Sequence, residues 1–415
     1  MNATKLDDVF RKARAFRRVN FVDAVLNFSP WPHHEFAFLC TEARALKNLA
    51  RKTVNRPPRV SGNQWGFLSS AATMTLVLVI TFSACVAVSA AEFSLNATQV
   101  LFEGAVDGSA GADVGGGFFV GATDENNKLR LYDVKGGHSR QTLDVGVDAA
   151  VKSALGLKKV KECDLEGAAK IADLIFWIGS HGRNEHAKEK KERQVLFATK
   201  LTGVGRAAKL EIAGEVYTQL VDDLLKDSTL APFDLAKAAT LAPKAEGGLN
   251  IESLATDRGK LWIGFRNPQS KAKDALLIPL LNPTEIIKKG ARAKLGDPLL
   301  LNLGRLGVRD MVAWNDGFLI IGGDFVDRFA PGAKPSRVFS WKPGTEPKDI
   351  GVDFGDLNPE AIMIMGEGDK ARILILSDDG KYPGRNGKKA FRGVWLQQAG
   401  APATGVSAPT PARIR

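Results

Sequence analysis

Five acidic residues stand in similar surroundings along this 415-residue chain. Each precedes a short apolar stretch, which leads through a turn into a second apolar stretch that ends in polar residues. The five acids are Glu103, Glu166, Glu252, Asp310 and Glu360. The polar residues that accompany them include Asp124, His181, Arg183, Arg266, Asn267, Arg309, Asp378 and Asp379. In an antiparallel pair the start of one strand lies beside the end of the next, so we expect the acids and the polar residues to meet.

A ring of five carboxylates needs something to neutralise it, because like charges in a partly buried site repel one another and raise each other's pKa. The negative charge of the ring can be neutralised in two ways, by basic side chains or by a metal ion. In the first, the ring acids pair with arginines that tie the repeats together, namely Arg183, Arg266 and Arg309. In the second, a hard cation such as Ca²⁺ binds in the ring. Its oxygen ligands would come from Asp124, Asp378 and Asp379.

A third kind of site is hydrolytic. His181 or a carboxylate such as Glu166 acts as general base, and Arg183 helps to hold a small anionic or ester substrate. The other residues of the pattern then bind the ligand, namely Glu103, Glu252, Arg266, Asn267, Arg309, Asp310 and Glu360. The sequence contains no G-x-S-x-G, no phosphate-binding G-x-x-x-x-G-K-[ST] and no H-E-x-x-H motif. Only three histidines follow residue 91, so a histidine-rich zinc or copper site is not expected.

The elements that position these residues repeat five times. Third strands are expected at 128–134, 193–201, 274–281, 336–343 and 391–398, and fourth strands at 141–147, 209–217, 298–304 and 348–354. The fifth repeat takes its fourth strand from 92–100. Turns such as Asp257-Arg258-Gly259 and Asn315-Asp316-Gly317 suit hairpins, because these residues tolerate positive φ. The pattern predicts an all-β fold, a β-propeller of five four-stranded blades closed by the N-terminal strand, with six blades as the alternative.

The blades carry insertions, and the longest gap between repeats includes 217–241, which is expected to be helical and to lie on one face. In a propeller the start of the innermost strand and the end of the second strand lie on the same face. The acids and the polar residues of all blades should therefore converge at one mouth of the central channel.

The stretch 66–91 contains no charged residue, follows Arg56 and Arg59, and ends in small residues. These features are typical of a secretory signal peptide, which we place at 54–91. The alternatives are an uncleaved membrane anchor, or lipid attachment at Cys85 in Phe82-Ser83-Ala84-Cys85. The expected location is periplasmic or secreted, or else membrane-anchored, and the membrane enters only through that anchor or lipid.

The predicted domain organisation places the propeller at 92–398. Residues 1–53 are interpreted as a non-native or unstructured extension, and 399–415 as a disordered tail. Without the signal peptide only Cys163 remains, so no intramolecular disulfide can form. Residues 1–91 carry 12 Lys and Arg against 5 Asp and Glu, and the remainder carries 45 against 41. This mixed charge lacks the basic stripe that nucleic-acid binding requires.

Several motifs resemble, in the same order, those of an uncharacterised bacterial family known as domain of unknown function 3616. They span about 100–396 and read FEGAVD, DLEGAAKI with WIGSHGRN, GGLNIESLA with IGFRNP, LGVRDM, NPEAI, and LSDDG with FRG. The resemblance implies an exported or membrane-attached protein without an assigned activity. More distantly, the blade pattern is similar to the phytase-like propeller family with esterase activity, although the strand ends carry no lysine cluster of the kind that binds phosphate.

Two functions are consistent with the sequence. The first is a metal-assisted hydrolase of phosphoester or ester bonds, with its site at the channel mouth. The second is a non-enzymatic propeller that binds a ligand or an envelope component, in which the acidic ring is structural.

Overall fold

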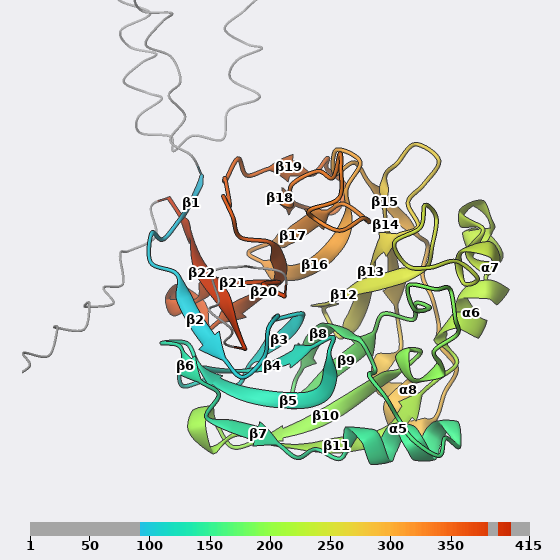
Figure 1. Cartoon of the computed structure of the whole chain (residues 1–415), viewed down its shortest axis with the longest axis horizontal. Helices are drawn as coiled ribbons and strands as arrows, with labels where there is room; N and C mark the ends of the chain where they lie inside the picture. The colour runs from blue at the N-terminus through green and yellow to red at the C-terminus, as the bar shows by residue number, and fades with distance from the viewer. Residues whose placement is uncertain (1–91, 381–388, 400–415) are drawn as a thin grey trace, which may run out of the picture. The chain divides into compact units, whose positions relative to one another are not determined.

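Five antiparallel sheets surround a central axis in the computed structural model, which describes residues 92–380 and 389–399 (Figure 1). The predicted all-β propeller of five four-stranded blades is therefore confirmed, and the alternative of six blades does not occur in this part of the chain. The predicted extension at 1–53, the signal peptide at 54–91 and the tail beyond Ala399 lie outside the described residues.

Each blade follows the chain from its innermost strand outward. Blade 1 consists of β3 (Ala110–Asp113), β4 (Phe118–Thr123), β5 (Asn126–Asp133) and β7 (Gln141–Leu143). Blade 2 consists of β8 (Leu165–Ile171), β9 (Leu174–Gly179), β10 (Leu196–Thr202) and β11 (Lys209–Tyr217). Blade 3 consists of β12 (Asn250–Asp257), β13 (Lys260–Asn267), β14 (Ala275–Leu280) and β15 (Leu299–Leu301).

Blade 4 consists of β16 (Gly307–Trp314), β17 (Gly317–Gly323), β18 (Arg337–Trp341) and β19 (Lys348–Asp349). Blade 5 consists of β20 (Pro359–Met365), β21 (Arg372–Ser377) and β22 (Ala390–Gln398), and β2 (Val100–Glu103) completes it. The expected third and fourth strands are all present, although the fourth strands of blades 1, 3 and 4 are shorter than expected.

The hairpins follow from the turn residues. Between β12 and β13, Arg258 and Gly259 have φ of 48° and 81°, the positive values that a tight hairpin turn requires and that glycine adopts without strain. The innermost strands β3, β8, β12, β16 and β20 contact one another in that order around the axis. The start of each therefore lies close to the channel mouth.

The core is divided into five clusters, and each fills the space between two neighbouring blades. A blade that packs on both faces needs apolar side chains on both, so its central strands read as continuous apolar runs. In β9 and β14 every residue is buried. Between blades 5 and 1 the cluster is aromatic, because Phe102 lies with its ring centroid 5.1 Å from that of Phe119 and 5.3 Å from that of Phe391.

The ring is closed by the N-terminal segment, as predicted, but in two pieces. β1 (Phe93–Leu95) pairs with the last residues of β22, and β2 pairs with its first residues. The short strand β6 (Gly137–His138) then lies parallel to β2 and links it to blade 1. The two ends of the closing seam also meet, since the amide of Ala399 donates to the carbonyl of Glu92 at 2.8 Å.

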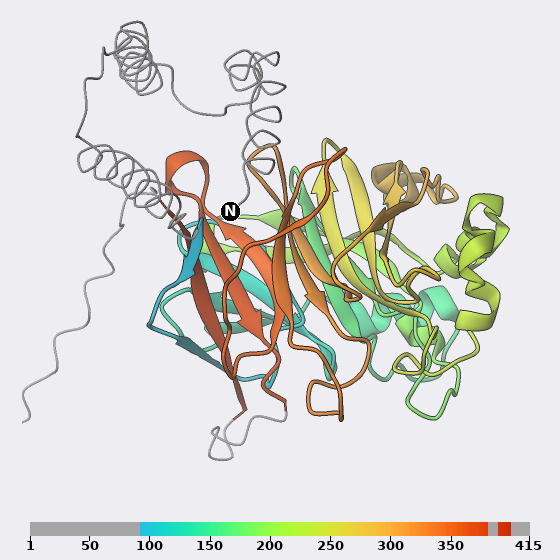
Figure 2. The ribbon, with the colours of Figure 1, turned by 90° about the horizontal axis from the view of Figure 1, so that it is seen from above.

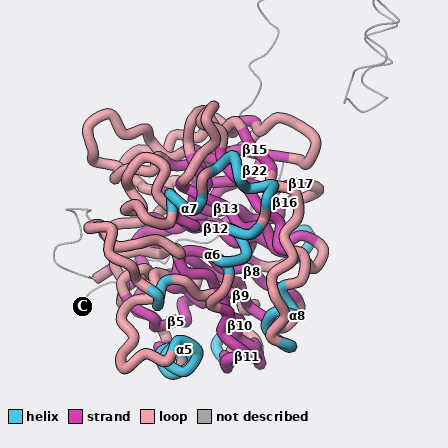
Figure 3. The backbone as a smooth tube through the Cα atoms, turned by 90° about the vertical axis from the view of Figure 1, so that its right-hand side faces the viewer, coloured by secondary structure: helices cyan, strands magenta, loops and turns pink. Residues whose placement is uncertain are grey.

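Helices lie along one side of the ring, outside blades 2 and 3 (Figures 2 and 3). The stretch predicted as helical contains α6 (Leu220–Lys226), a 3₁₀ segment at Ser228–Phe233 and α7 (Leu235–Ala238). Two further helices were not expected: α5 (Val147–Leu155) and α8 (Pro283–Lys289), which both contact β11. Among the described residues, none of the helices has the length and apolar character needed to cross a bilayer.

Candidate functional site

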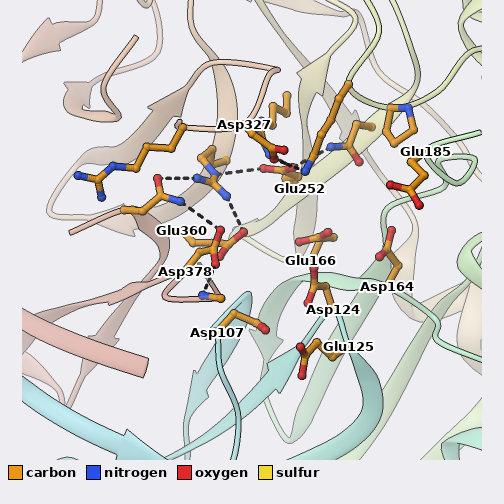
Figure 4. A pocket seen from close by; sticks show the side chains of 18 of the residues that line it. Asp107, Asp124, Glu125, Asp164, Glu166, Glu185, Glu252, Asp327, Glu360 and Asp378 are labelled. Atoms are coloured by element: carbon orange, nitrogen blue, oxygen red, sulfur yellow. Dashed lines mark hydrogen bonds and ion pairs between the residues drawn. The ribbon is translucent and has the colours of Figure 1, made fainter. Parts of the chain in front are cut away.

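The channel mouth opens into a cavity of about 940 Å³, which we call the mouth pocket, and all five blades contribute to it (Figure 4). Of the described residues that line it, thirteen are acidic and six are basic. The acids are Asp107, Asp124, Glu125, Glu162, Asp164, Glu166, Glu185, Glu252, Asp327, Asp356, Glu360, Asp378 and Asp379. The basic residues are Lys190, Arg193, Lys244, Arg266, Arg309 and Arg328. The expected convergence of acids at one mouth therefore occurs, with a partly different set of residues.

A β-bulge positions the innermost residue in four of the blades. The pairing register of β8, β12, β16 and β20 shifts at one residue near the mouth. A bulge leaves the extra residue out of the ladder and redirects its side chain. The residues at these positions are Glu166, Glu252, Arg309 and Glu360.

Asp310 is the first correction, because in blade 4 the bulge residue is Arg309. Asp310 does not line the mouth pocket but is buried between the blades. Its carboxylate accepts from the amides of Ile362 and Met311, both at 2.8 Å. Burial raises its pKa well above the usual range of an aspartate, and these amide hydrogen bonds oppose that shift. Its place one residue after the bulge turns it away from the channel.

Glu103 is the second correction. It ends β2, the outer strand of blade 5, and its carboxylate lies 2.8 Å from Nδ1 of His138 on β6. It is absent from the pocket lining because β2 closes the ring instead of beginning blade 1. Blade 1 contributes Asp107, which precedes β3, and Asp124, which follows β4.

Blades 3, 4 and 5 form what we call the arginine side of the pocket, made of Asn250, Glu252, Arg266, Arg309, Asn358 and Glu360. Arg309 donates to Oε2 of Glu252 at 3.3 Å and to Oε1 of Glu360 at 2.5 Å. Arg266 donates to Oε1 of Glu252 at 2.6 Å and to the carbonyls of Asp324 and Val326. Burial lowers the pKa of Arg309, but the two glutamates outweigh it and the net shift is upward. On this side the arginines already neutralise the acids.

Blades 1 and 2 form the acid side, made of Asp107, Asp124, Asp164 and Glu166. Carboxylate oxygens of Asp124, Asp164 and Glu166 all lie within 4.8 Å of one another. Glu166 is only 8% exposed and makes no hydrogen bond or ion pair with any described residue. Arg193 contacts this side from its edge, where it donates to Asp164 and to Glu162, each at 2.8 Å.

Among the described residues, Arg193 is the only basic residue that forms an ion pair with an acid of this side. Burial, with Asp107 and Glu360 nearby, raises the pKa of Asp124 to about 10. Burial also raises the pKa of Glu166 well above its usual range, and the carboxylates of Glu252 and Asp164 raise it further. Groups with such shifts occur most often at functional sites.

His181 and Arg183, predicted as catalytic with Glu166, do not line the mouth pocket. His181 is 2% exposed, its Nδ1 lies 2.7 Å from the carbonyl of Gly179, and burial lowers its pKa to about 4. Arg183 donates to the carbonyls of Ala239 at 2.6 Å and Ala187 at 3.0 Å, so it fixes a loop and pairs with no ring acid. The expectation that Arg183 tethers the acidic ring is wrong for this reason.

Of the other predicted residues, some line the pocket and others hold the loops or side chains around it. Asn267 donates to the carbonyls of Pro243 and Ala245 and fixes the loop that they belong to. Asp378 lines the pocket and accepts from Nδ2 of Asn358 at 3.1 Å. Asp379 is 1% exposed, and both of its carboxylate oxygens accept from the Arg392 guanidinium. Of the predicted metal ligands, only Asp124 belongs to the group of three oxygens.

Among the pocket residues that the sequence analysis missed are Asp107, Asp164, Arg193 and Asn358. Asp164 stands two residues before Glu166 in DLEG, and Asp107 follows Glu103 in FEGAVD, so both were visible as acids beside a motif. Arg193 precedes a third strand, where no pattern marks it. Its contacts with Asp164 and Glu162 depend on the path of the loop before β10.

Three solved structures illustrate what the chain is similar to. The first is Myxococcus xanthus glutaminyl cyclase, with 12% identity, coverage of 74% of this chain and 97% of that chain, and a TM-score of 0.37. The second is the major Malassezia sympodialis allergen Mala s 1, with 8% identity, coverage of 72% and 96%, and a TM-score of 0.42. The third is the PQQ-bound aldose sugar dehydrogenase from Streptomyces coelicolor, with 12% identity, coverage of 74% and 99%, and a TM-score of 0.38. These values support no inference about function.

Comparison of the sequence with protein-family models finds a match to one family. No curated protein matches the chain. The family resemblance stated from the sequence motifs is confirmed for the segment that runs from blade 2 to blade 5, because residues 195–382 match the family described as Protein of unknown function (DUF3616).

Proposed function

We propose that the mouth pocket is the active site of a hydrolase that cleaves phosphoester or ester bonds with the help of a divalent cation. The observation that carries this proposal is the contrast between the two sides of the pocket. The arginine side is neutralised by Arg266 and Arg309, whereas the acid side keeps a buried, unpartnered Glu166 beside two aspartates.

A cation on the acid side would supply what the pocket lacks for this chemistry. Every guanidinium nitrogen of Arg266 and Arg309 already donates to a glutamate, to Asn358 or to a backbone carbonyl, so their charge is largely compensated before a substrate binds. A divalent cation polarises a carbonyl or phosphoryl oxygen and increases the acidity of a bound water. A pocket carboxylate such as Asp107 or Asp378 would accept a proton from the attacking water as the water oxygen bonds to the carbonyl carbon or phosphorus. The C–O or P–O ester bond would then break, and the same carboxyl group would return the proton to the departing oxygen, which leaves as the alcohol.

The roles that the sequence predicted change accordingly. Glu166 keeps a place in the reaction, whereas His181 and Arg183 have none because neither reaches the pocket. The distant similarity to the phytase-like propeller family is in keeping with this reaction class. Export through the predicted signal peptide at 54–91 would place the protein in calcium-containing surroundings, and it remains part of the proposal.

The second candidate is a non-enzymatic binding propeller, and one specific observation favours it. Arg309 joins Glu252 of blade 3 to Glu360 of blade 5, so this half of the acidic ring already has a structural role. In a binding module the whole pocket would hold a ligand, and a cation would strengthen binding without any turnover.

Turnover distinguishes the two candidates. The purified full chain would be assayed with p-nitrophenyl acetate, p-nitrophenyl phosphate and bis-p-nitrophenyl phosphate, in EDTA and then with added Ca²⁺ or Mg²⁺. We expect metal-dependent hydrolysis that E166Q reduces at least about 100-fold, whereas E346Q, at an exposed acid outside the pocket, keeps it. If no substrate is turned over with either metal, or if E166Q retains full activity, the hydrolase proposal fails.

A further inference from the structure

We propose that Asp124, Asp164 and Glu166 together bind one Ca²⁺ ion at the boundary between blades 1 and 2. This inference deepens the proposed function because it concerns the same pocket, but cation binding does not require that hydrolysis takes place. The three residues come from separate elements: the end of β4, the segment before β8 and the bulge in β8.

The spacing of the three carboxylates suits a single ion of this size. Their oxygens lie within 4.8 Å of one another, and Figure 4 shows the three side chains close together at one side of the pocket. Calcium–oxygen distances are about 2.4 Å, so two ligands on opposite sides of the ion are about 4.8 Å apart. One Ca²⁺ ion can therefore reach all three residues without a change of the main chain.

Glu166 supplies the second, independent observation. Its side chain is more than nine-tenths buried, the bulge directs it into the pocket, and no described residue donates to it. A buried ionised carboxylate without a partner is strongly unfavourable, so such a group either keeps its proton or receives a cation. Nearby, Arg193 is already engaged by Asp164 and Glu162, and it makes no hydrogen bond or ion pair with Glu166.

The charges around the site leave room for one divalent ion. With their carboxyl groups ionised, as they would be around a bound cation, Asp124, Asp164, Glu166 and Glu162 carry four negative charges. Among the described residues, Arg193 and Lys190 bring two positive charges to Asp164 and Glu162. A single Ca²⁺ ion would make this group neutral. The oxygen-only ligands favour a hard cation over zinc or copper, and the open side of the pocket leaves further coordination positions for water or substrate.

Calcium binding to the full chain tests the proposal. After treatment with EDTA, the protein would be titrated calorimetrically with CaCl₂ and MgCl₂, and its melting temperature would be recorded in parallel. We expect one Ca²⁺ per chain and a rise in Tm of about 4 °C at a hundredfold excess over Kd. D124N and E166Q should each weaken Ca²⁺ binding at least about 30-fold, whereas E125Q, one residue from Asp124, should change it less than about twofold.

The variants also separate loss of binding from loss of folding. E166Q removes a charge from a group of like charges, so the metal-free variant should melt at or above the temperature of the unaltered chain. The proposal is overturned if Ca²⁺ neither binds nor raises Tm at about 10 mM, which is roughly ten to a hundred times the Kd of extracellular Ca²⁺ sites. It is equally overturned if D124N and E166Q both bind like the unaltered chain. Ca²⁺ binding that depends on these residues without any hydrolysis would reject only the proposed function. Hydrolysis in EDTA would reject the part of the cation in the proposed reaction, and the titration alone would decide on the Ca²⁺ site.

Discussion

Arg309 stands at the bulge of β16, the position that an acid occupies in β8, β12 and β20. Its guanidinium reaches one glutamate in the blade before and one in the blade after. One basic residue in this ring of acids therefore neutralises two neighbours and joins three blades. The described bulge residue on the acid side is Glu166 instead of an arginine, and this difference, together with Arg266 on β13, gives the pocket its two halves.

Replacement of Arg309 by methionine should strongly destabilise the fold. The change keeps much of the side-chain length but leaves Glu360 buried without its counter-charge, and breaking a buried pair in this way costs about 3–5 kcal/mol. Urea unfolding followed by circular dichroism measures the effect. As a control, R337M removes an exposed partner of Asp349 and should cost less than about 1 kcal/mol.

The double variant R309M/E360Q gives a further check on the cause. It removes the orphaned charge together with the arginine, so it should recover part of the lost stability. If R309M alone unfolds within about 1 kcal/mol of the unaltered chain, the bridge does not hold the blades together.

At the scale of elements, the short strand β2 completes blade 5 and so closes the ring of blades. This four-residue strand places Phe102 among aromatic rings of blades 5 and 1, while Leu101 points outward from the same strand. The two residues therefore differ in burial but share the same backbone pairing with β22.

F102A should destabilise the propeller by about 3–5 kcal/mol, because a fully buried phenylalanine is replaced by a cavity. L101A, at a side chain that is 43% exposed, should change stability by less than about 0.5 kcal/mol. Denaturant unfolding of the two variants side by side measures the difference. Equal effects would mean that β2 contributes only its backbone hydrogen bonds.

The blades were predictable from the sequence because their strands are apolar on both faces and their turns carry Asn, Asp and Gly. The third strand expected at 128–134, for example, is Asn126–Asp133 in the structure. The bulges were not predictable, because these strands are apolar on both faces and a one-residue shift in register therefore interrupts no alternation of polar and apolar residues. For this reason the acid of LGVRDM was placed in the ring and the arginine beside it was not.

The candidate site was predictable only where a residue stands on an inner strand or at its end. Glu166, Glu252 and Glu360 were placed correctly by the repeat alone. Glu103 was misplaced because the closing strand carries an acid-led apolar stretch like the others, and only ring closure reveals it as an outer strand. Arg193 belongs to a long loop, and its contact with Asp164 depends on tertiary structure that no local pattern encodes.

At the scale of the whole molecule, the shifted carboxylates predict that stability falls as pH rises. Asp124 has a pKa of about 10 in the fold and about 4 in an unfolded chain, and the pKa of Glu166 is raised as well. Between these values the folded protein holds protons that the unfolded chain releases, so the free energy of unfolding decreases with increasing pH. Each such proton contributes about 1.4 kcal/mol per pH unit.

The window from pH 7 to 8.5 isolates this effect. His181, with its pKa lowered to about 4, makes stability rise with pH only below about 6.5, and the raised pKa of Cys163 matters only near and above 9. The free energy of unfolding of the metal-free chain, measured with urea, should fall as the pH rises across this window. E166Q should show a smaller loss, and a flat or rising profile for the unaltered chain would contradict the prediction.

The seam between β1 and β22 also determines how the propeller responds to mechanical tension. The amide of Ala399 bonds to the carbonyl of Glu92, and the next pairs join Phe93 to Gln398 and Leu95 to Leu396. Both ends of the described domain thus leave one antiparallel pair at the same point. A pull between residues 92 and 399 acts across the strand pair, so the hydrogen bonds between β1 and β22 break one after another instead of all at once. The ring should open at this seam under low force while blades 2 to 4 stay folded.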